Sequence, residues 1–286
     1  MSFVPYRVHV STLRTAARRV LNGVERMVGR RNMARAARFF WLEVRLDGPN
    51  TIEFNGEQLV QSSLNGAAGP IEVLDVGAHF GEWSTSLLNQ VPRDDLHVTC
   101  FEPSTYTFER LSAHFVDHRR APRLEGIALG NREGTAVLRI VHNGAGSNSL
   151  VTFVAERALQ QEEEVAISTV DAYCASQGLQ NVALLKIDAE GADLDVMKGA
   201  AEMLAQQRIG LLQFEYNHRW IHARGYLKDA FDLLQPHGYS LGKVTARGIE
   251  EYPAWHEELE TFRESNYLAY LPSWRERLPV FPWWNA

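Results

Sequence analysis

The stretch Val73-Leu-Asp-Val-Gly-Ala-His-Phe-Gly-Glu-Trp-Ser84 decides the fold of this chain. Its first residues are typical of a buried strand, and its glycines predict a tight turn that leads into a helix. Gly77 and Gly81 would let the backbone approach a ligand closely. A second predicted strand, residues 97–102, ends in a glutamate that can hold both hydroxyls of a ribose. Together the two segments predict a binding site for a nucleoside-bearing cofactor.

The spacing of the glycines narrows the choice of cofactor. A dinucleotide-binding fingerprint, Gly-x-Gly-x-x-Gly, would need glycine at the positions that His79 and Glu82 occupy. A pyrophosphate therefore cannot approach this loop as it does in dehydrogenases. A loop that follows Asp75 and has the single pattern Gly77-x-x-x-Gly81 suits a ligand with an amino-acid tail in place of phosphates. S-adenosylmethionine (SAM) is such a ligand, and we expect it to be the cofactor.

The composition is that of an ordinary globular protein. The 286 residues are 45% hydrophobic and carry a net charge of −6, which argues against a dedicated nucleic-acid-binding protein. The two cysteines, Cys100 and Cys174, are too few for a disulfide framework and lack a metal-binding spacing. No apolar run is long enough to span a membrane, and the N-terminus lacks the apolar core of a signal peptide. We therefore expect a cytoplasmic protein.

The N-terminal part of the chain is rich in arginine, and between residues 7 and 45 its acidic residues are Glu25 and Glu43. Apolar residues recur at helical spacing, at Val10, Leu13, Ala17, Val20, Leu21, Val24 and Met27. A basic amphipathic helix of this kind can pack against its own domain or a second subunit, or it can lie on a membrane surface. We expect packing, including a homo-oligomer formed through these helices, and no membrane contact.

Strand and helix patterns alternate from residue 71 onward. The main strands are predicted at residues 71–76, 97–102, 123–128, 182–187, 209–214, 238–244 and 266–271. The helices between them are predicted at residues 82–90, 105–118, 170–177, 193–206 and 226–235. Such alternation produces right-handed βαβ units and a mainly parallel sheet. An inserted β pair is predicted at residues 136–141 and 165–169, and the last two main strands are predicted to form an antiparallel edge hairpin.

Acidic residues follow several of these strands. Ligands of an open α/β sheet bind outside the carboxyl ends of its strands, so residues at those ends are candidates for function. Asp188 and Glu190 follow one predicted strand, and Glu215 and His218 follow the next. A carboxylate at such a strand end has no evident structural task, and we predict a functional acidic rim.

Taken together, the motifs resemble those of the FkbM family of SAM-dependent methyltransferases. The matching segments are Asp75-Val-Gly-Ala-x-x-Gly81, Glu102-Pro103, Ala128-Leu-Gly130, Gly146-Ser-Asn-Ser-Leu150, Ser168-Thr-Val-Asp171, Lys186-Ile-Asp-Ala-Glu-Gly191 and Phe214-Glu215. The family commonly has asparagine where this chain has His79, and either side chain can hydrogen-bond across the turn. The resemblance, over about residues 70–271, implies an α/β, Rossmann-like class I methyltransferase fold with a mainly parallel seven-stranded sheet. We expect this SAM-dependent methyltransferase domain at residues 70–286, after an N-terminal helical segment at residues 1–69.

The resemblance also implies which residues contact the cofactor. The expected SAM contacts are Asp75, Gly77, Ala78, His79, Phe80, Gly81, Ser84, Glu102, Pro103, Ala128, Ser147, Asn148 and Asp188. Among them, Glu102 would hold the ribose and Asp188 the amino group. No metal ligand is expected.

The implied reaction is methyl transfer from SAM to a hydroxyl oxygen, commonly on a sugar or a polyketide-type natural product. The transfer is an in-line displacement, so the protein must align the hydroxyl and remove its proton. The candidate bases are Asp188, Glu190, Glu215 and His218, of which we prefer Glu215 and His218. The expected acceptor is a small molecule or a glycan.

Three alternatives are weighed against this interpretation. A methyltransferase acting on nucleic-acid bases would need an Asn/Asp-Pro-Pro-aromatic turn where Asp188-Ala-Glu-Gly191 stands. In a magnesium-assisted O-methyltransferase, which we do not favour, Asp188, Glu190 and Glu215 would supply oxygen ligands. A non-catalytic SAM-binding module would have no reason to keep acidic residues at its strand ends.

Overall fold

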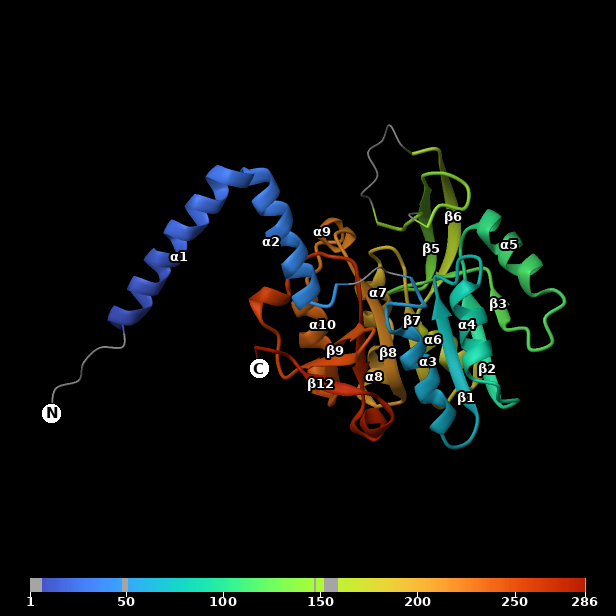
Figure 1. The fold of residues 1–286 in the computed structure, drawn as a ribbon. Coiled ribbons are helices and arrows are strands. Elements are labelled where there is room, and N and C mark those ends of the chain that lie inside the picture. The colour runs from blue at the N-terminus through green and yellow to red at the C-terminus, as the bar shows by residue number, and fades with distance from the viewer. Residues whose placement is uncertain (1–6, 48–50, 147, 152–158, 286) are drawn as a thin grey trace. The chain divides into compact units, whose positions relative to one another are not determined.

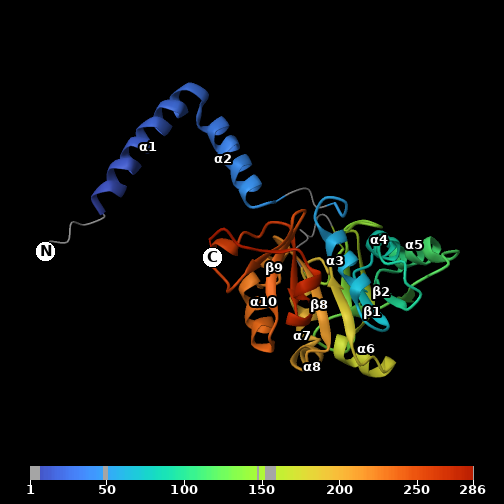
Figure 2. The ribbon, with the colours of Figure 1, turned by 60° about the horizontal axis from the view of Figure 1, so that its bottom comes forward.

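The computed structural model describes residues 7–47, 51–146, 148–151 and 159–285 of the chain. The chain divides into two compact units, residues 1–48 and residues 49–286. The second unit contains the α/β domain, whose sheet and helices are shown from two directions in Figures 1 and 2.

A sheet of nine strands in the order β12-β10-β9-β11-β8-β7-β1-β2-β3 runs through the second unit. Its strands are β1 (Ile71–Val76), β2 (Leu96–Phe101), β3 (Arg123–Glu125), β7 (Val182–Ile187), β8 (Ile209–Tyr216), β9 (Ser240–Thr245), β10 (Gly248–Tyr252), β11 (Ser265–Tyr270) and β12 (Val280–Pro282). The strands from β8 to β3 are parallel, whereas β11 runs antiparallel to both β8 and β9. The predicted Rossmann-like α/β fold is therefore confirmed, with nine strands in place of the predicted seven.

Helices cover both faces of this sheet because successive side chains of a strand point to opposite faces. In β1, for example, Val73 belongs to one apolar core and the next residue, Leu74, to the other. The helices of the first core are α3 (Glu57–Ser63), α4 (Glu82–Gln90) and α5 (Thr105–Phe115). The helices of the second core are α6 (Val170–Gln177), α7 (Asp193–Lys198), α8 (Ala201–Ala205) and α10 (Leu227–Leu234). The shorter helical elements are η1 (Leu64–Gly66), α9 (Arg219–His222), η3 (Gln235–His237), η4 (Glu257–Leu259) and η5 (Pro272–Arg277).

The strand order reverses between β1 and β7. The chain adds β2 and β3 on one side of β1, and later adds β7 and β8 on the other side. The loops that leave the carboxyl ends of β1 and β7 therefore diverge, and such a point is where α/β sheets bind ligands. Both of the main sequence motifs, residues 73–84 and residues 184–199, pass through this point.

A second, smaller sheet has three strands in the order β4-β6-β5. They are β4 (Ala128–Leu129), β5 (Gly134–Ile140) and β6 (Gln161–Ser168). Antiparallel pairing of β5 with β6 confirms the predicted inserted pair. The predicted single strand at residues 123–128 is wrong. The chain leaves the main sheet after Glu125 and passes through Gly126, and Ala128 then pairs with Ile167 of β6.

The predicted helix at residues 193–206 is also divided, into α7 and α8. The division falls at Gly199, where an added Cβ would lie 1.9 Å from the carbonyl oxygen of Gly130. The helix layer lies against the end of the β4 segment at this point, and the helix is interrupted there. The helical periodicity of the sequence is local and does not predict this contact.

The C-terminal strands are only partly as predicted. β9 and β11 pair antiparallel, as the strands at residues 238–244 and 266–271 were expected to do. They are not the edge of the sheet, because β10 and β12 extend it further. β12 has three residues and ends in Pro282, so its sequence carries little strand signal.

The first unit contains the helices α1 (Arg7–Val28) and α2 (Arg30–Val44), which are separated by Gly29. Within this unit the two helices leave large apolar side chains exposed, among them Leu21, Met27 and Phe40. In the part of the chain that the structure describes, neither these helices nor any other has the length and apolar character needed to span a membrane.

The segment before β1 packs with the second unit. Val60 of α3 and Leu64 of η1 are fully buried in the same apolar core as Ile71 and Leu87. The second unit therefore begins earlier in the chain than the predicted boundary between residues 69 and 70.

Candidate active site

A cavity of about 370 Å³ lies at the carboxyl ends of β1, β2 and β7. This volume is in the range that small-molecule and cofactor sites occupy. The predicted cofactor-binding residues that line the cavity are Gly77, Ala78, His79, Glu102, Pro103, Ala128, Asn148 and Asp188. Glu190, one of the predicted catalytic residues, lines it as well.

The turn after β1 needs glycine. Gly77 has φ +78°, and an added Cβ would lie 1.9 Å from the backbone oxygen of Asp188. The backbone N–H groups of Gly77 and Ala78 both donate to the carbonyl of Phe101, at 3.0 Å each. His79 follows with a positive φ of 50°. The turn is thus fixed between the ends of β2 and β7, with its backbone on the cavity wall.

Glu102 follows β2 and faces this turn. Its Oε2 accepts a hydrogen bond from the backbone N–H of His79 at 3.1 Å, and its Oε1 accepts one from Ser104 at 3.0 Å. Burial raises the pKa of Glu102 to about 7, against these hydrogen bonds, which lower it. A carboxylate can accept about four hydrogen bonds, so both oxygens keep acceptor capacity for a diol.

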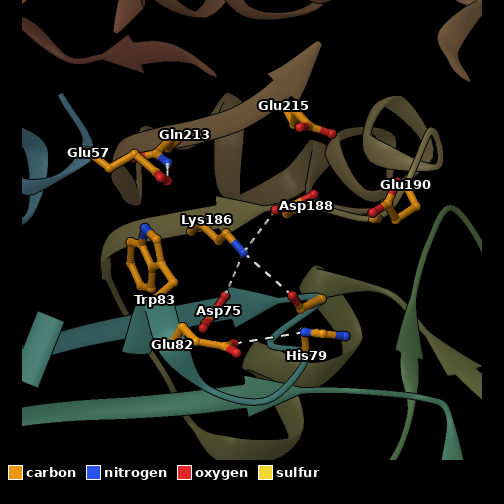
Figure 3. Close-up of polar contacts among 12 residues, drawn as sticks. Glu57, Asp75, His79, Glu82, Trp83, Lys186, Asp188, Glu190, Gln213 and Glu215 are labelled. Carbon is orange, nitrogen blue, oxygen red and sulfur yellow. Dashed lines mark hydrogen bonds and ion pairs between the residues drawn. The ribbon is translucent and has the colours of Figure 1, made fainter. Parts of the chain in front are cut away.

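Lys186 is a buried cation at the centre of the site (Figure 3). Its Nζ lies 3.1 Å from Asp75 Oδ1 and 3.6 Å from Asp188 Oδ2. Burial acts against the charge of Lys186, but Asp75 and Asp188 outweigh it and raise the pKa of the amine. Asp75 Oδ2 also accepts a hydrogen bond from Ser84 Oγ at 2.6 Å. Asp75 and Ser84 therefore hold Lys186 and the turn in place from behind the cavity wall.

The turn after β7 carries two of the candidate catalytic carboxylates, Asp188 and Glu190. Glu190 has a positive φ of 53°, and Gly191 follows with φ +96°. Asp193 stabilises the turn, because its carboxylate accepts hydrogen bonds from the backbone N–H groups of Ala189 at 3.2 Å and Gly191 at 3.0 Å. Burial raises the pKa of Asp193 to about 7, and the nearby Asp188 acts in the same direction.

Glu190 is tied to two other segments. Its Oε2 lies 2.8 Å from Arg219 Nη1, and its backbone oxygen accepts a hydrogen bond from Ser149 Oγ at 2.7 Å. Burial and the charge of Asp188 raise the pKa of Glu190 to about 8, although Arg219 lowers it. Glu190 is therefore a carboxylate of unusual basicity on a cavity wall, which is typical of catalytic acids and bases.

The structure places the other candidate bases outside the cavity lining. Glu215, at the end of β8, is buried and accepts a hydrogen bond from Asn217 Nδ2. Burial, together with the charges of Asp188 and Glu190, raises the pKa of Glu215 well above its ordinary range. His218 is exposed at the start of α9. Neither residue is among those that line the cavity.

Several predicted cofactor residues also lie off the cavity wall. The ring of Phe80 lies against that of His79 at a tilt of 41°, with centroids 3.9 Å apart, and Gly81 is the left-handed N-cap residue that precedes α4. Like Asp75 and Ser84, they are not among the lining residues. Ser147 lies outside the described residues. Asn148 does line the cavity, and its Oδ1 accepts a hydrogen bond from the backbone N–H of Val141 at 3.0 Å.

Other lining residues are absent from the predicted set, notably Glu57, Trp83 and Lys186. Lys186 could have been predicted from the sequence, because a charged residue inside an apolar strand requires buried partners of opposite charge. Trp83 falls on the buried side of α4, where a tryptophan is indistinguishable from an ordinary core residue. Glu57 had no signal, because it lies on a short helix that precedes the first motif.

No group of three His, Cys, Asp or Glu side chains within the described ranges is arranged to hold a metal ion. The carboxylates that a magnesium-assisted reaction would use are Asp188, Glu190 and Glu215. Two of them line the cavity, and Glu190 is already paired with Arg219.

The geometry fits SAM on three observations of this structure. Gly77 lines the cavity and has no side chain, so a ligand can meet its backbone there. Glu102 offers acceptor atoms for a ribose at the end of β2. Trp83 lines the cavity, and its Nε1 is a buried donor that has no hydrogen-bond partner among the described residues.

The sheet order and the site at its switch point define a class I, Rossmann-like methyltransferase fold. The Methyltransferase FkbM domain matches residues 75–241, which is more than half of the chain. The chain belongs to the FkbM methyltransferase family, and the predicted membership is confirmed.

Individual relatives are distant. The AMB antimetabolite synthetase AmbE of Pseudomonas aeruginosa is 26% identical over 59% of this chain and 9% of its own length. A methyltransferase FkbM of Methylobacillus flagellatus has a TM-score of 0.45 and 15% identity, over 70% of this chain and 44% of that chain. A precorrin-6y C5,15-methyltransferase of Geobacter metallireducens has a TM-score of 0.40 and 12% identity, over 75% of this chain and 87% of that chain. The chain thus spans less than half the length of the first two.

Proposed function

We propose that this chain is a SAM-dependent O-methyltransferase that methylates a hydroxyl group of a sugar or a polyketide-type natural product. The observation that carries the proposal is that the Gly77 turn, Glu102 and Glu190, whose pKa is raised to about 8, line the same cavity. Membership of the FkbM family supports the cofactor and the type of group transferred. The hydroxyl acceptor and its class come from the family resemblance of the motifs. A cytoplasmic location stays a prediction.

The residues around the cavity have distinct tasks toward the cofactor. Glu102 would accept hydrogen bonds from the ribose hydroxyls, and the Gly77 turn would meet the ligand with its backbone. The apolar side chains of Phe101, Ile127 and Leu129 would enclose the adenine. When bound, SAM supplies an electrophilic methyl group on a sulfonium centre. The task left to the protein is to place the acceptor hydroxyl in line with that group and to remove its proton.

We assign the proton transfer to Glu190 among the four candidate bases. Neither Glu215 nor His218 lines the cavity, whereas Asp188 and Glu190 both do. Each of these two has a cationic neighbour, Lys186 at 3.6 Å from Asp188 and Arg219 at 2.8 Å from Glu190, so the cation does not decide between them. A base works best when its pKa lies near the working pH, and the pKa of Glu190 is about 8. Arg219 would hold the carboxylate in position while it accepts the proton.

Substitution of the base tests this assignment. Glu190→Gln should lower turnover about 10²–10⁴-fold and leave the affinity for S-adenosylhomocysteine nearly unchanged. The wild-type rate should rise with pH toward a plateau above about 8, because the carboxylate must be deprotonated to act. Transfer of labelled methyl from SAM to glycan and polyketide acceptors would identify the acceptor and then provide the rate assay.

The other candidates serve as comparisons. Glu215→Gln and His218→Ala should retain most of the turnover. If either variant loses most of its turnover while Glu190→Gln stays active, the general base is the residue changed in that variant and not Glu190. Loss of activity on adding a chelator would favour the magnesium-assisted reaction. Binding of S-adenosylhomocysteine without turnover on any hydroxylated acceptor would instead indicate a non-catalytic SAM-binding module.

A further inference from the structure

The cavity is lined in part by a residue that lies outside the matched family domain. Glu57 of α3 lines the cavity, although the FkbM match begins at residue 75. Its carboxylate is held by two amides, because Oε2 accepts from Asn55 Nδ2 at 2.7 Å and Oε1 accepts from Gln213 Nε2. Burial raises the pKa of Glu57, against the two amides and Lys186, which lower it. The carboxylate would therefore gain from a cation placed against its remaining acceptor sites.

Trp83 also lines the cavity and carries a buried donor. Trp83 is 7% exposed, and its Nε1 has no hydrogen-bond partner among the described residues. Figure 3 shows the indole nitrogen on the side of the ring that faces Glu57 and Gln213. The ammonium of Lys186 lies 5.7 Å from the centre of the same ring. A buried indole N–H usually has an acceptor, so this one points to a ligand atom.

Glu57 is separated from the proposed ribose position at Glu102 by the order of the strands. Glu57 is bonded to Gln213 on β8, whereas Glu102 follows β2, and β7 and β1 lie between those two strands. A ligand whose nucleoside lies at Glu102 would therefore extend across the Gly77 turn toward Glu57 and Trp83.

We propose that Glu57 and Trp83 form the subsite for the α-amino-acid head of SAM. Glu57 would accept hydrogen bonds from the α-ammonium group, in place of Asp188, to which the family resemblance assigns that group and which lies beside Lys186. The indole N–H of Trp83 would donate to the α-carboxylate, and Lys186 would add positive charge nearby. A zwitterion satisfies both groups at once, whereas a simple cation or anion satisfies one of them. The inference rests on the proposed use of SAM and adds the segment before β1 to the cofactor site.

A structural role for the same residues predicts different behaviour. If Glu57 only ties α3 to β8, its replacement would lower stability and weaken every cofactor analogue alike. The proposal instead predicts losses that depend on which part of the ligand is present. Ligands that differ only in the amino-acid head therefore distinguish the two roles.

The test is calorimetric titration of the full chain with three ligands. They are S-adenosylhomocysteine, 5′-methylthioadenosine, which lacks the amino-acid head, and decarboxylated S-adenosylhomocysteine, which keeps the ammonium group and the neutral thioether. Glu57→Gln and Trp83→Phe should each weaken S-adenosylhomocysteine about tenfold and leave methylthioadenosine unchanged. The decarboxylated analogue should respond to Glu57→Gln and not to Trp83→Phe.

Two control variants complete the design. Trp284→Phe, at a tryptophan that is 51% exposed, should change none of the three affinities. Glu102→Gln should weaken all three ligands, since each carries the ribose. Thermal unfolding of every variant checks that it is folded, and Trp83→Phe tests the subsite independently if Glu57→Gln unfolds.

Each remaining outcome contradicts a specific statement. Equal losses for S-adenosylhomocysteine and methylthioadenosine, or no loss for either, would overturn the amino-acid subsite and leave the proposed function standing. If the wild-type chain binds neither ligand, the proposed cofactor is wrong and the subsite is wrong with it.

Discussion

At the scale of single residues, Lys186 is the group whose loss should matter most for folding. It is a buried ammonium between Asp75 and Asp188, in a strand that is otherwise apolar. Removing one partner of a buried ion pair leaves the other charge without compensation in a medium of low polarity. We expect Lys186→Met to lower the free energy of unfolding by about 3–5 kcal/mol, as measured by urea denaturation.

Lys198 provides a matched control for this change. It lies 3.2 Å from Asp195, but both side chains are 50% exposed. Such surface pairs contribute little, so Lys198→Met should change the free energy of unfolding by less than about 1 kcal/mol. Equal stability of the two variants would show that Lys186 is not held by its carboxylates.

Glu102 is the residue on which ribose binding should depend. Losing its charge-assisted hydrogen bonds in Glu102→Ala should reduce the affinity for S-adenosylhomocysteine by roughly 1.5–3 kcal/mol. Because its pKa is raised to about 7, the wild-type affinity should also fall as the pH drops below that value and the carboxylate takes up a proton. Calorimetry at pH 6 and pH 8 checks both statements. Unchanged affinity in the variant would contradict the assignment.

At the scale of elements, the sequence predicts best where a local pattern determines the structure. The helix at residues 82–90 and its glycine turn are as predicted, because the φ of Gly77 and the period of α4 are local properties. The strand at residues 123–128 breaks, since its second half finds a partner in β6, far along the chain. β10 and β12 are short, and pairing with neighbouring strands decides whether they form.

In the candidate site, too, the sequence predicts the residues that a local pattern positions and misses those that long-range packing positions. Gly77, Glu102, Asp188 and Glu190 reach the cavity because each follows a strand whose carboxyl end the motifs identify. Glu57 is brought there by tertiary packing of α3 on the sheet, which no local pattern predicts. His218 shows the opposite case, since it follows the right strand and yet its side chain is exposed.

The N-terminal helices lead to a prediction at this scale. Within their unit they leave Leu21, Met27 and Phe40 exposed beside many arginines, and exposed apolar faces of this kind generally have a partner. We expect that partner to be the catalytic unit or a second copy of the chain. If the partner is the catalytic unit, deletion of residues 1–45 should lower the melting temperature. If it is a second copy, the deletion should reduce the number of chains per particle, as measured by light scattering. Co-sedimentation of the full chain with liposomes, lost on the same deletion, would support a membrane surface instead.

At the scale of the whole molecule, the acidic site should make the chain less stable as the pH rises. Burial raises the pKa values of Glu102 and Asp193 to about 7, and burial with the charge of Asp188 raises that of Glu190 to about 8. Their ordinary values are 4.5 for glutamate and 3.8 for aspartate. Between those limits the folded chain binds more protons than the unfolded chain. Stability therefore falls with increasing pH and levels off once the folded carboxyls have ionised.

The melting temperature of the ligand-free chain should accordingly be several degrees lower at pH 8.5 than at pH 5.5, since each kcal/mol shifts it by about 2–4 °C in a domain of this size. Glu190→Gln removes one ionising group, so its melting temperature should fall less steeply over the same interval. A site that favours a basic carboxylate for catalysis would thus reduce stability at the pH where that carboxylate acts. A melting temperature that is flat or rises from pH 5.5 to pH 8.5, or an unchanged slope in Glu190→Gln, would show that these carboxyls ionise normally in the folded chain. The assignment of Glu190 as a base with a raised pKa of about 8 would then lose its physical basis.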